Sequence, residues 1–256
     1  MSFDLTKSKV LTFDVYATLI DWETGIFKEL SPLLGRLPPF SPHWQETLKE
    51  TKSFLLKCFA EGELEVESAN PQMIYSTILS KVFFIIASKL GVEVTEAEAV
   101  SFGGSIGRWE AYPDTVDALH RLQKFYKLIP LSNCDRKSFN NTLSGPLKGV
   151  NFDAIYLAED IGAYKPNKKN FDYMVEHIKS EFGFEKQEIL HTAQSLTHDH
   201  VPAKMLGFAP TAWISRGAGK TTMGGDPIDD STFNLGVTYT TLGDMADAAE
   251  KAFGAK

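Results

Sequence analysis

The residue that could act as a nucleophile is Asp14, which ends an apolar run beginning near Lys9. An ionised carboxylate can attack a substrate, and an aspartate that closes a buried strand is poorly solvated unless another group uses it. Asp14 alone is equally well explained as a turn or helix N-cap residue. Its chemistry therefore depends on which polar groups lie near it.

Three later positions supply polar groups after apolar runs. Ser132 and Asn133 are small hydrogen-bonding residues that suit an anionic group, and Lys165 opens a loop before a proline. A lysine near Asp14 would keep its carboxylate ionised. Asp199 adds a second carboxylate, where a helix is expected to begin. Each of these residues can also be explained as a turn residue, a solvated residue or a helix N-cap. The prediction of a site therefore rests on their combination.

The elements that position these residues alternate along the chain. Predicted strands cover residues 9–20, 128–132, 152–157, 189–194, 208–215 and 236–239, and predicted helices cover 113–126, 167–181, 198–206 and 242–252. This alternation predicts an α/β fold with a Rossmann-like, doubly wound, mostly parallel sheet covered on both faces. Ligands of such sheets bind outside the carboxyl ends of the strands, where all four positions are expected.

A long insert without a good strand interrupts this alternation over residues 22–109. It holds helical segments at 42–59 and 71–90, and a third helix opens at Thr95 with Glu98 three residues on, a capping-box pattern. Segments this long inside an α/β domain are usually functional. We therefore expect a helical cap domain, residues 23–109, over a core domain of residues 1–22 and 110–256.

Composition limits the classes of function. The chain has 256 residues, 43% of them hydrophobic, and a net charge of −7, which disfavours nucleic-acid and anionic-membrane partners. Its two cysteines, Cys58 and Cys134, form no disulfide or metal pattern, so a reducing compartment is expected. The start of the sequence lacks a secretory apolar segment, and the apolar run 82–87 is too short to span a bilayer. These features predict a cytoplasmic protein.

The polar positions, in this order and each at a strand end, resemble the motifs of the haloacid dehalogenase (HAD) superfamily. Asp14 matches the nucleophile of the first motif and Thr18 the hydroxyl four residues later. Ser132, Lys165 and Asp199 match the second, third and fourth motifs, and the helical insert matches the family's cap. The resemblance covers about residues 8–215 and implies a hydrolase with an aspartate nucleophile.

Two positions depart from the magnesium-dependent phosphatases, which are most of that superfamily. Tyr16 stands where they have a general-acid aspartate, and Gln194 where they have a metal-binding aspartate. With Asp14 and Asp199 the only acidic residues left at these motif positions, the site is too poor in charge for Mg²⁺. The sequence Phe-Asp-Val-Tyr-Ala-Thr-Leu around Asp14 instead looks like the type II 2-haloacid dehalogenases, which use no metal. We therefore expect no metal ion and no cofactor.

The resemblance to that branch implies a role for each motif residue. Asp14 would displace halide to form a covalent ester, and water positioned by Asp199 would hydrolyse that ester. Lys165 would hold Asp14 ionised, with Thr18 and Ser132 orienting it. Asn133 would help to hold the departing halide.

The expected substrate is a small anionic molecule, but the residues that bind it are less well matched. The branch carries a cap arginine where this chain has residues 41–45, which include none. Arg36 could replace it, although its loop also has the pattern of a solvated turn. The other candidates for substrate binding are Tyr16, Trp44 and His198. The sequence is compatible with a homodimer and does not fix the oligomeric state.

Further departures keep two alternatives open. Phe171, Gln194 and Leu196 replace a tyrosine, a serine and an asparagine of the branch. A phosphatase acting on small phosphate esters and a non-catalytic protein of the same fold are therefore alternatives to C–halogen cleavage.

Two local patterns do not indicate a site. Residues 216–231 are predicted as a surface loop, and their P-loop-like segment 217–222 is preceded by Ile214 where the motif needs glycine. Successive residues at the start of a helix point about 100° apart, so the side chains of His198 and His200 are not expected to converge on one metal ion. We expect one to face the active site and the other the surface. Of the cap aromatics Trp44, Tyr75, Phe83 and Phe84, at most two are expected to touch a ligand.

Overall fold

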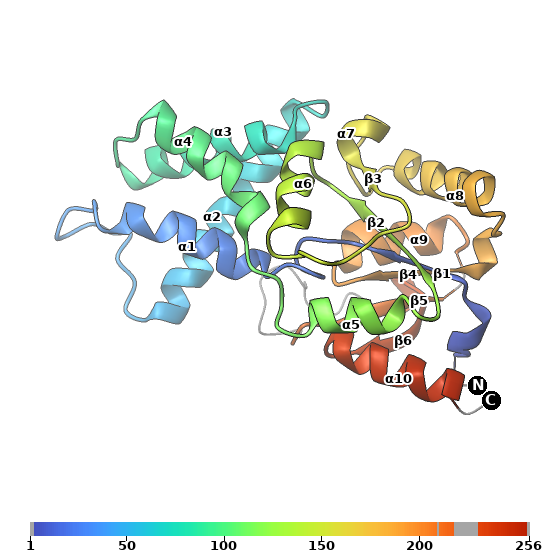
Figure 1. Ribbon diagram of the computed structural model, residues 1–256. Coiled ribbons are helices and arrows are strands. Elements are labelled where there is room, and N and C mark those ends of the chain that lie inside the picture. The colour runs from blue at the N-terminus through green and yellow to red at the C-terminus, as the bar shows by residue number, and fades with distance from the viewer. Residues whose placement is uncertain (1–2, 209, 218–229, 255–256) are drawn as a thin grey trace.

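One parallel sheet organises the structure, a computed structural model that describes residues 3–208, 210–217 and 230–254 (Figure 1). Its strands follow the order β3-β2-β1-β4-β5-β6, and every neighbouring pair is parallel. The strands are β1 (Val10–Phe13), β2 (Lys127–Ser132), β3 (Tyr156–Leu157), β4 (Ile189–Ala193), β5 (Thr211–Ile214) and β6 (Leu235–Tyr239). The strand order reverses beside β1, which confirms the predicted doubly wound α/β fold.

Helices cover both faces of the sheet because successive strand residues point to opposite sides. Leu11 and Leu128 pack in the cluster that includes α5 (Thr115–Leu122) and α10 (Leu242–Gly254). Val10 and Ile129 pack in a second cluster with α8 (Lys168–Phe182) and α9 (Val201–Met205). All four residues of β1 are buried, as expected of a strand at the centre of a parallel sheet.

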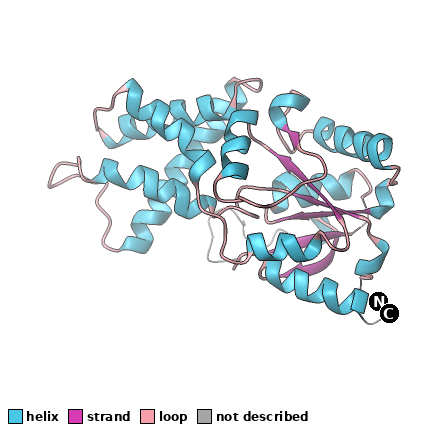
Figure 2. Ribbon diagram, in the orientation of Figure 1, coloured by secondary structure: helices cyan, strands magenta, loops and turns pink. Residues whose placement is uncertain are grey.

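Four helices form a separate layer beside the sheet, at the left of Figure 1: α1 (Trp22–Leu34), α2 (Leu48–Ala69), α3 (Tyr75–Leu90) and α4 (Glu96–Gly103). The strands of Figure 2 all lie outside this layer. The chain enters and leaves it at adjacent points, since Ile20 forms an antiparallel bridge with Ala111. α4 begins with the predicted capping box of Thr95 and Glu98.

The remaining helices are short. They are α6 (Arg136–Ser144), α7 (Ala158–Ile161), η1 (Leu5–Lys7), η2 (Gly104–Arg108), η3 (Lys186–Glu188), the π-helical η4 (Leu196–His200) and η5 (Asp230–Thr232). Within the described ranges, no helix is long and apolar enough to cross a membrane.

Several predicted boundaries were wrong. β1 ends at Phe13 rather than near residue 20, because the chain then turns through Ala17 at φ 79°. β3 has two residues instead of six. The helix predicted at 42–59 starts only at the capping box of Thr47 and Glu50 and continues to Ala69. α1 was not predicted at all. Most of the predicted loop 216–231, with its P-loop-like segment, lies outside the described residues.

Candidate active site

A tight loop after β1 turns Thr18 back towards Asp14. The carbonyl of Val15 accepts hydrogen bonds from the backbone N–H groups of Thr18, Leu19 and Ile20. This fold of the loop places Thr18 Oγ1 2.6 Å from Asp14 Oδ2, to which it donates. One oxygen of the expected nucleophile is thus fixed by a hydroxyl four residues away, as the motif implied.

Lys165 joins the two catalytic candidates that the sheet brings together. Its Nζ lies 2.8 Å from Asp14 Oδ1 and 2.7 Å from Asp199 Oδ1, and the whole residue is 1% exposed. Asn133 holds the lysine backbone from the end of β2: its Oδ1 accepts from Lys165 N and its Nδ2 donates to Lys165 O. Only the second N–H of that amide is left for a ligand.

Asp199 lies inside η4 and is not a helix N-cap, so that alternative is wrong. The N-cap is Ser195, whose hydroxyl accepts from His198 N. Asp199 is completely buried; its Oδ1 accepts from Lys165 and from His191 Nε2 at 2.9 Å. Its Oδ2 has no hydrogen-bond partner among the described residues. This oxygen is therefore the one able to accept a proton from a ligand or water.

The lysine does not act equally on the two carboxylates. Burial raises the pKa of Asp14 and Asp199 adds to that rise, although the Lys165 ammonium opposes it. Burial acts on Asp199 too, but Lys165 and His191 together hold its pKa well below the usual range. Burial works against the charge of Lys165, yet both carboxylates raise its pKa overall. As the pH falls, Asp14 is the first of the pair to take up a proton.

Ser132 and Tyr16 complete the wall around Asp14. Ser132 Oγ is buried and makes no hydrogen bond within the described part of the chain. The hydroxyls of Tyr16 and Thr142 hydrogen-bond at 2.9 Å, and the Tyr16 ring meets Trp109 edge to face. Burial raises the pKa of the Tyr16 phenol well above its ordinary value. Its ring therefore faces the site while its hydroxyl is bound to α6.

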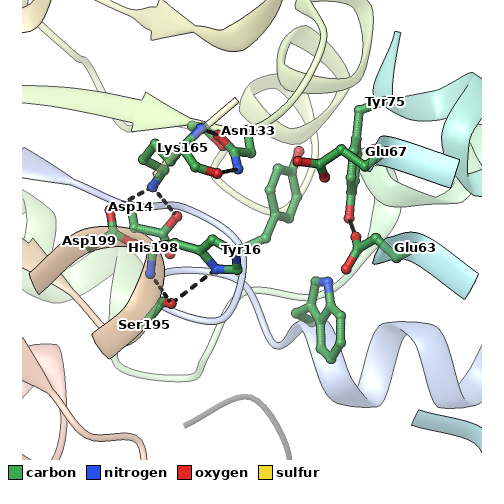
Figure 3. Close-up of a pocket in the computed structure, with 12 residues that line it drawn as sticks. Asp14, Tyr16, Glu63, Glu67, Tyr75, Asn133, Lys165, Ser195, His198 and Asp199 are labelled. Atoms are coloured by element: carbon green, nitrogen blue, oxygen red, sulfur yellow. Dashed lines mark hydrogen bonds and ion pairs between the residues drawn. The ribbon is translucent and has the colours of Figure 1, made fainter. Parts of the chain in front are cut away.

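These groups line a cavity of about 70 Å³, roughly the space of a few water molecules (Figure 3). Asp14, Lys165, Asp199 and His198 lie on one side of it, and the cap layer supplies the other side. The lining residues are Asp14, Tyr16, Trp22, Glu63, Glu67, Tyr75, Ser132, Asn133, Lys165, Ser195, His198 and Asp199. Of the cap residues among them, only Tyr75 was a candidate from the sequence.

Two predicted substrate-binding residues do not line the cavity. Arg36 donates to the carbonyl of Glu93 and forms an ion pair with Glu98 at the surface. Trp44 is 47% exposed and donates from its indole to the carbonyl of Pro38. The structure therefore does not support either residue as a contact for a substrate in this cavity.

The two histidines of η4 have different environments. His198 lines the cavity, and burial lowers its pKa. His200 is completely buried; its Nε2 donates to the carbonyl of Ala193 and its Nδ1 lies 2.7 Å from Thr211 Oγ1. The expectation that one of the pair faces the surface was wrong.

The charge of the cavity differs from the expectation. Its described lining holds four carboxylates, Asp14, Asp199, Glu63 and Glu67, and Lys165 is the only lysine or arginine in it. That lysine is already bonded to two of the carboxylates. This lining does not supply the positive charge that the expected anionic substrate needs.

The donor groups do not fit a magnesium ion. Mg²⁺ takes about six oxygen ligands in near-octahedral geometry. In the residues that the structure describes, no group of three or more His, Cys, Asp or Glu side chains is placed to hold a metal. Asp14 and Asp199 instead converge on the ammonium of Lys165.

The sequence matches no protein-family model and no curated protein. Its structure, however, is similar to solved structures of HAD hydrolases. A defluorinating L-2-haloacid dehalogenase has a TM-score of 0.72 at 17% identity, with 98% of this chain and 99% of the other covered. The L-2-haloacid dehalogenase of Xanthobacter autotrophicus, solved with chloropropionic acid covalently bound, has a TM-score of 0.72 at 17% identity over 95% and 98% of the chains.

A protein of Bacillus subtilis described as a HAD hydrolase, solved with magnesium bound, is also similar. Its TM-score is 0.69 at 19% identity, covering 94% of this chain and 98% of the other. At identities this low, the similarity establishes the fold alone. The chain has the fold of the HAD superfamily and its L-2-haloacid dehalogenases.

Proposed function

We propose that this chain, which has the HAD fold, is a metal-independent hydrolase that cleaves a carbon–halogen bond through an ester on Asp14. The observation that carries this proposal is the position of Lys165 Nζ, within 2.8 Å of both Asp14 and Asp199. The lysine provides the positive charge for a nucleophile and for a second carboxylate, the role that a divalent ion would otherwise have.

In the first step, a carboxylate oxygen of Asp14 attacks the carbon that carries the halogen. The new C–O bond forms as the C–halogen bond breaks, and halide leaves with the bonding electrons. Lys165 and Thr18 each donate to one oxygen of Asp14, which fixes the plane of the carboxylate for this attack. The free N–H of Asn133 and the hydroxyl of Ser132 are the donors proposed for the departing halide.

In the second step, water attacks the Asp14 carbonyl carbon and gives one proton to Oδ2 of Asp199. The bond between that carbon and the Asp14 oxygen joined to the substrate breaks, and the alcohol leaves with this oxygen and the other proton. Asp199 then releases its proton, so the products are the alcohol, halide and one proton. The lack of a protein partner for Asp199 Oδ2 supports this role, since Oδ1 already accepts two hydrogen bonds.

The proposed function specifies the bond that is broken, a carbon–halogen bond, and does not specify a 2-haloacid as the substrate. Arg36, the candidate for binding a substrate carboxylate, does not reach the cavity. We also propose that residues 23–109 are a cap domain over the core of residues 1–22 and 110–256. The adjacent crossings at Ile20 and Ala111, and the cap residues in the cavity wall, support this division.

Intact-mass spectrometry after rapid quenching tests the proposed function. The protein is mixed with 2-chloropropionate, 3-chloropropanol, 3-chloropropylammonium, phosphoglycolate or acetyl phosphate. We expect an alkyl adduct on the Asp14 peptide with a chlorinated compound and none in Asp14→Asn.

A single turnover in ¹⁸O-water adds a second readout. We expect the label in the Asp14 carboxylate and not in the alcohol, because water attacks the aspartyl carbon. An adduct on another residue, a phosphoryl adduct on Asp14, or label in the alcohol would each contradict the proposal.

A further inference from the structure

Helix α2 presents two carboxylates to the cavity, on the side opposite Lys165 (Figure 3). Glu63 and Glu67 are four residues apart, so they share one face of the helix. Tyr75 of α3 and Trp22 of α1 line the cavity beside them. We call Glu63 and Glu67 the acidic wall.

No lysine or arginine in the described part of the chain pairs with the acidic wall. Glu63 accepts a hydrogen bond from the hydroxyl of Tyr75, and the Glu67 carboxylate has no hydrogen bond or ion pair with any described residue. By contrast Glu61, an exposed residue two positions before Glu63 on the same helix, pairs with Lys89. The cavity side of α2 therefore carries two carboxylates that pair with no lysine or arginine among the described residues.

Burial makes this charge costly to keep. It raises the pKa of Glu63 to about 7 and also raises that of Glu67. Carboxylates in such surroundings gain most from a neighbouring positive charge. Two buried acceptors on the opposite wall, Ser132 Oγ and Asp199 Oδ2, also lack partners among the described residues, so both ends of the cavity have capacity for a hydrogen-bonding ligand.

We propose that the acidic wall binds a protonated amine at the end of the substrate that is remote from the carbon attacked by Asp14. An ammonium offers three donors to the two carboxylates, and the rings of Trp22 and Tyr75 also favour a cation. A substrate carboxylate would instead meet Glu63 and Glu67 with Lys165 already engaged. The inference rests on the proposed function in taking Asp14 as the reacting end of the cavity.

Binding of two fragments of equal size tests the inference without any turnover. Propylammonium and propionate are titrated at pH 8, where Glu63 is mostly ionised, and followed by ligand-observed NMR. Four proteins are compared: the unchanged chain, Glu63→Gln, Glu67→Gln and Glu65→Gln. Glu65 is the matched control because it is an exposed residue of α2 that does not line the cavity.

We expect propylammonium to bind more tightly than propionate and Glu67→Gln to weaken it about tenfold or more. Glu63→Gln should weaken it as well, and Glu65→Gln should not. Thermal melts establish that the variants are folded. Equal or tighter binding of propionate, binding of neither fragment, or no effect of Glu67→Gln would overturn the inference.

The two proposals can fail separately. If 2-chloropropionate forms an adduct on Asp14 and propionate competes with it, the proposed carbon–halogen cleavage is supported and the proposed amine-binding site is rejected. If propylammonium binds in a Glu67-dependent way but no chlorinated compound forms an alkyl adduct, the amine-binding site is supported and the proposed carbon–halogen cleavage is rejected.

Discussion

Nε2 of His191 lies 2.9 Å from Oδ1 of Asp199, and both side chains are completely buried. The low pKa of Asp199 keeps it ionised, so Nε2 carries the proton and donates. Nδ1 hydrogen-bonds with Thr12 Oγ1, 2.8 Å away. His191 therefore positions Asp199 from β4 without touching the cavity.

Replacing His191 should affect the second chemical step more than the first. His191→Phe removes a donor to Asp199, which raises the pKa of that carboxylate and frees its orientation. We expect the Asp14 ester to form at nearly the original rate and to be hydrolysed about tenfold or more slowly. Quenched-flow mass spectrometry measures both rates, and His191→Gln, which retains a donor, should recover part of the loss. Equal slowing of both steps would show that His191 has only a structural role.

The stability of Asp14 and Lys165 variants should be strongly non-additive. Because the folded-state pKa of Asp14 is raised, its ionised form costs stability above that pKa, and the cost disappears as the pH falls through it. Asp14→Asn should therefore abolish turnover and increase the free energy of unfolding at pH 7.

Lys165→Ala leaves two buried carboxylates without their cation and should cost about 3–5 kcal/mol. The double variant should recover part of that loss. Urea denaturation of the four proteins gives these values. Additive effects, or an active Asp14→Asn, would contradict the mechanism.

Magnesium should have no effect on this protein. Lys165 already lies between Asp14 and Asp199, so the ion would have to displace a buried ammonium. We expect EDTA to leave activity unchanged and Mg²⁺ to leave the melting temperature unchanged. A ligand of the native state at 100 times its Kd stabilises by about 2.7 kcal/mol, which a melt detects readily. A shift of that size with Mg²⁺-dependent phosphate release would favour the phosphatase alternative.

The stability of the chain should depend on pH through Glu63. Its folded-state pKa of about 7 lies above the ordinary 4.5, so the ionised form costs stability above pH 7 and this cost is absent below pH 4.5. Glu63→Gln should therefore be more stable than the unchanged chain at pH 8, by about 1 kcal/mol or more. The difference should shrink towards pH 5. A gain that is the same at both pH values would show that the substitution acts through packing and not through charge.

The sequence predicts those features that depend on local pattern. The short apolar runs predict a parallel sheet, and polar residues at strand ends predict that Asp14, Lys165 and Asp199 lie together, as they do. The capping box at Thr95 marks the start of α4 correctly. α1 could also have been found, since Trp22, Ile26, Leu30 and Leu33 recur at helical spacing.

The rest depends on tertiary orientation. Nothing in the sequence of α2 distinguishes Glu63 and Glu67 from its solvated acidic residues, because only the packing of α2 against α1 and α3 turns them into the cavity. His191 is a single polar residue within an apolar run, and its partner Asp199 is eight residues further on. Arg36 was proposed by elimination, and the surface carboxylate of Glu98 binds it instead.

The central place of β1 in the sheet has a consequence for synthesis on the ribosome. Asp14 is translated first of the three, Lys165 follows 151 residues later, and Asp199 follows after another 34. At 5–20 residues per second, on the order of ten to forty seconds pass before the site is complete. During this time β1 lacks its neighbour β2 until Lys127–Ser132 is made and its neighbour β4 until Ile189–Ala193 is made, and its terminal carboxylate lacks its counter-ion until Lys165 is made. The segment that forms β1 and ends at Asp14 therefore stays hydrated and accessible, so proteases or chaperones should bind it in nascent chains stalled before Lys165 and not in those that extend past β4.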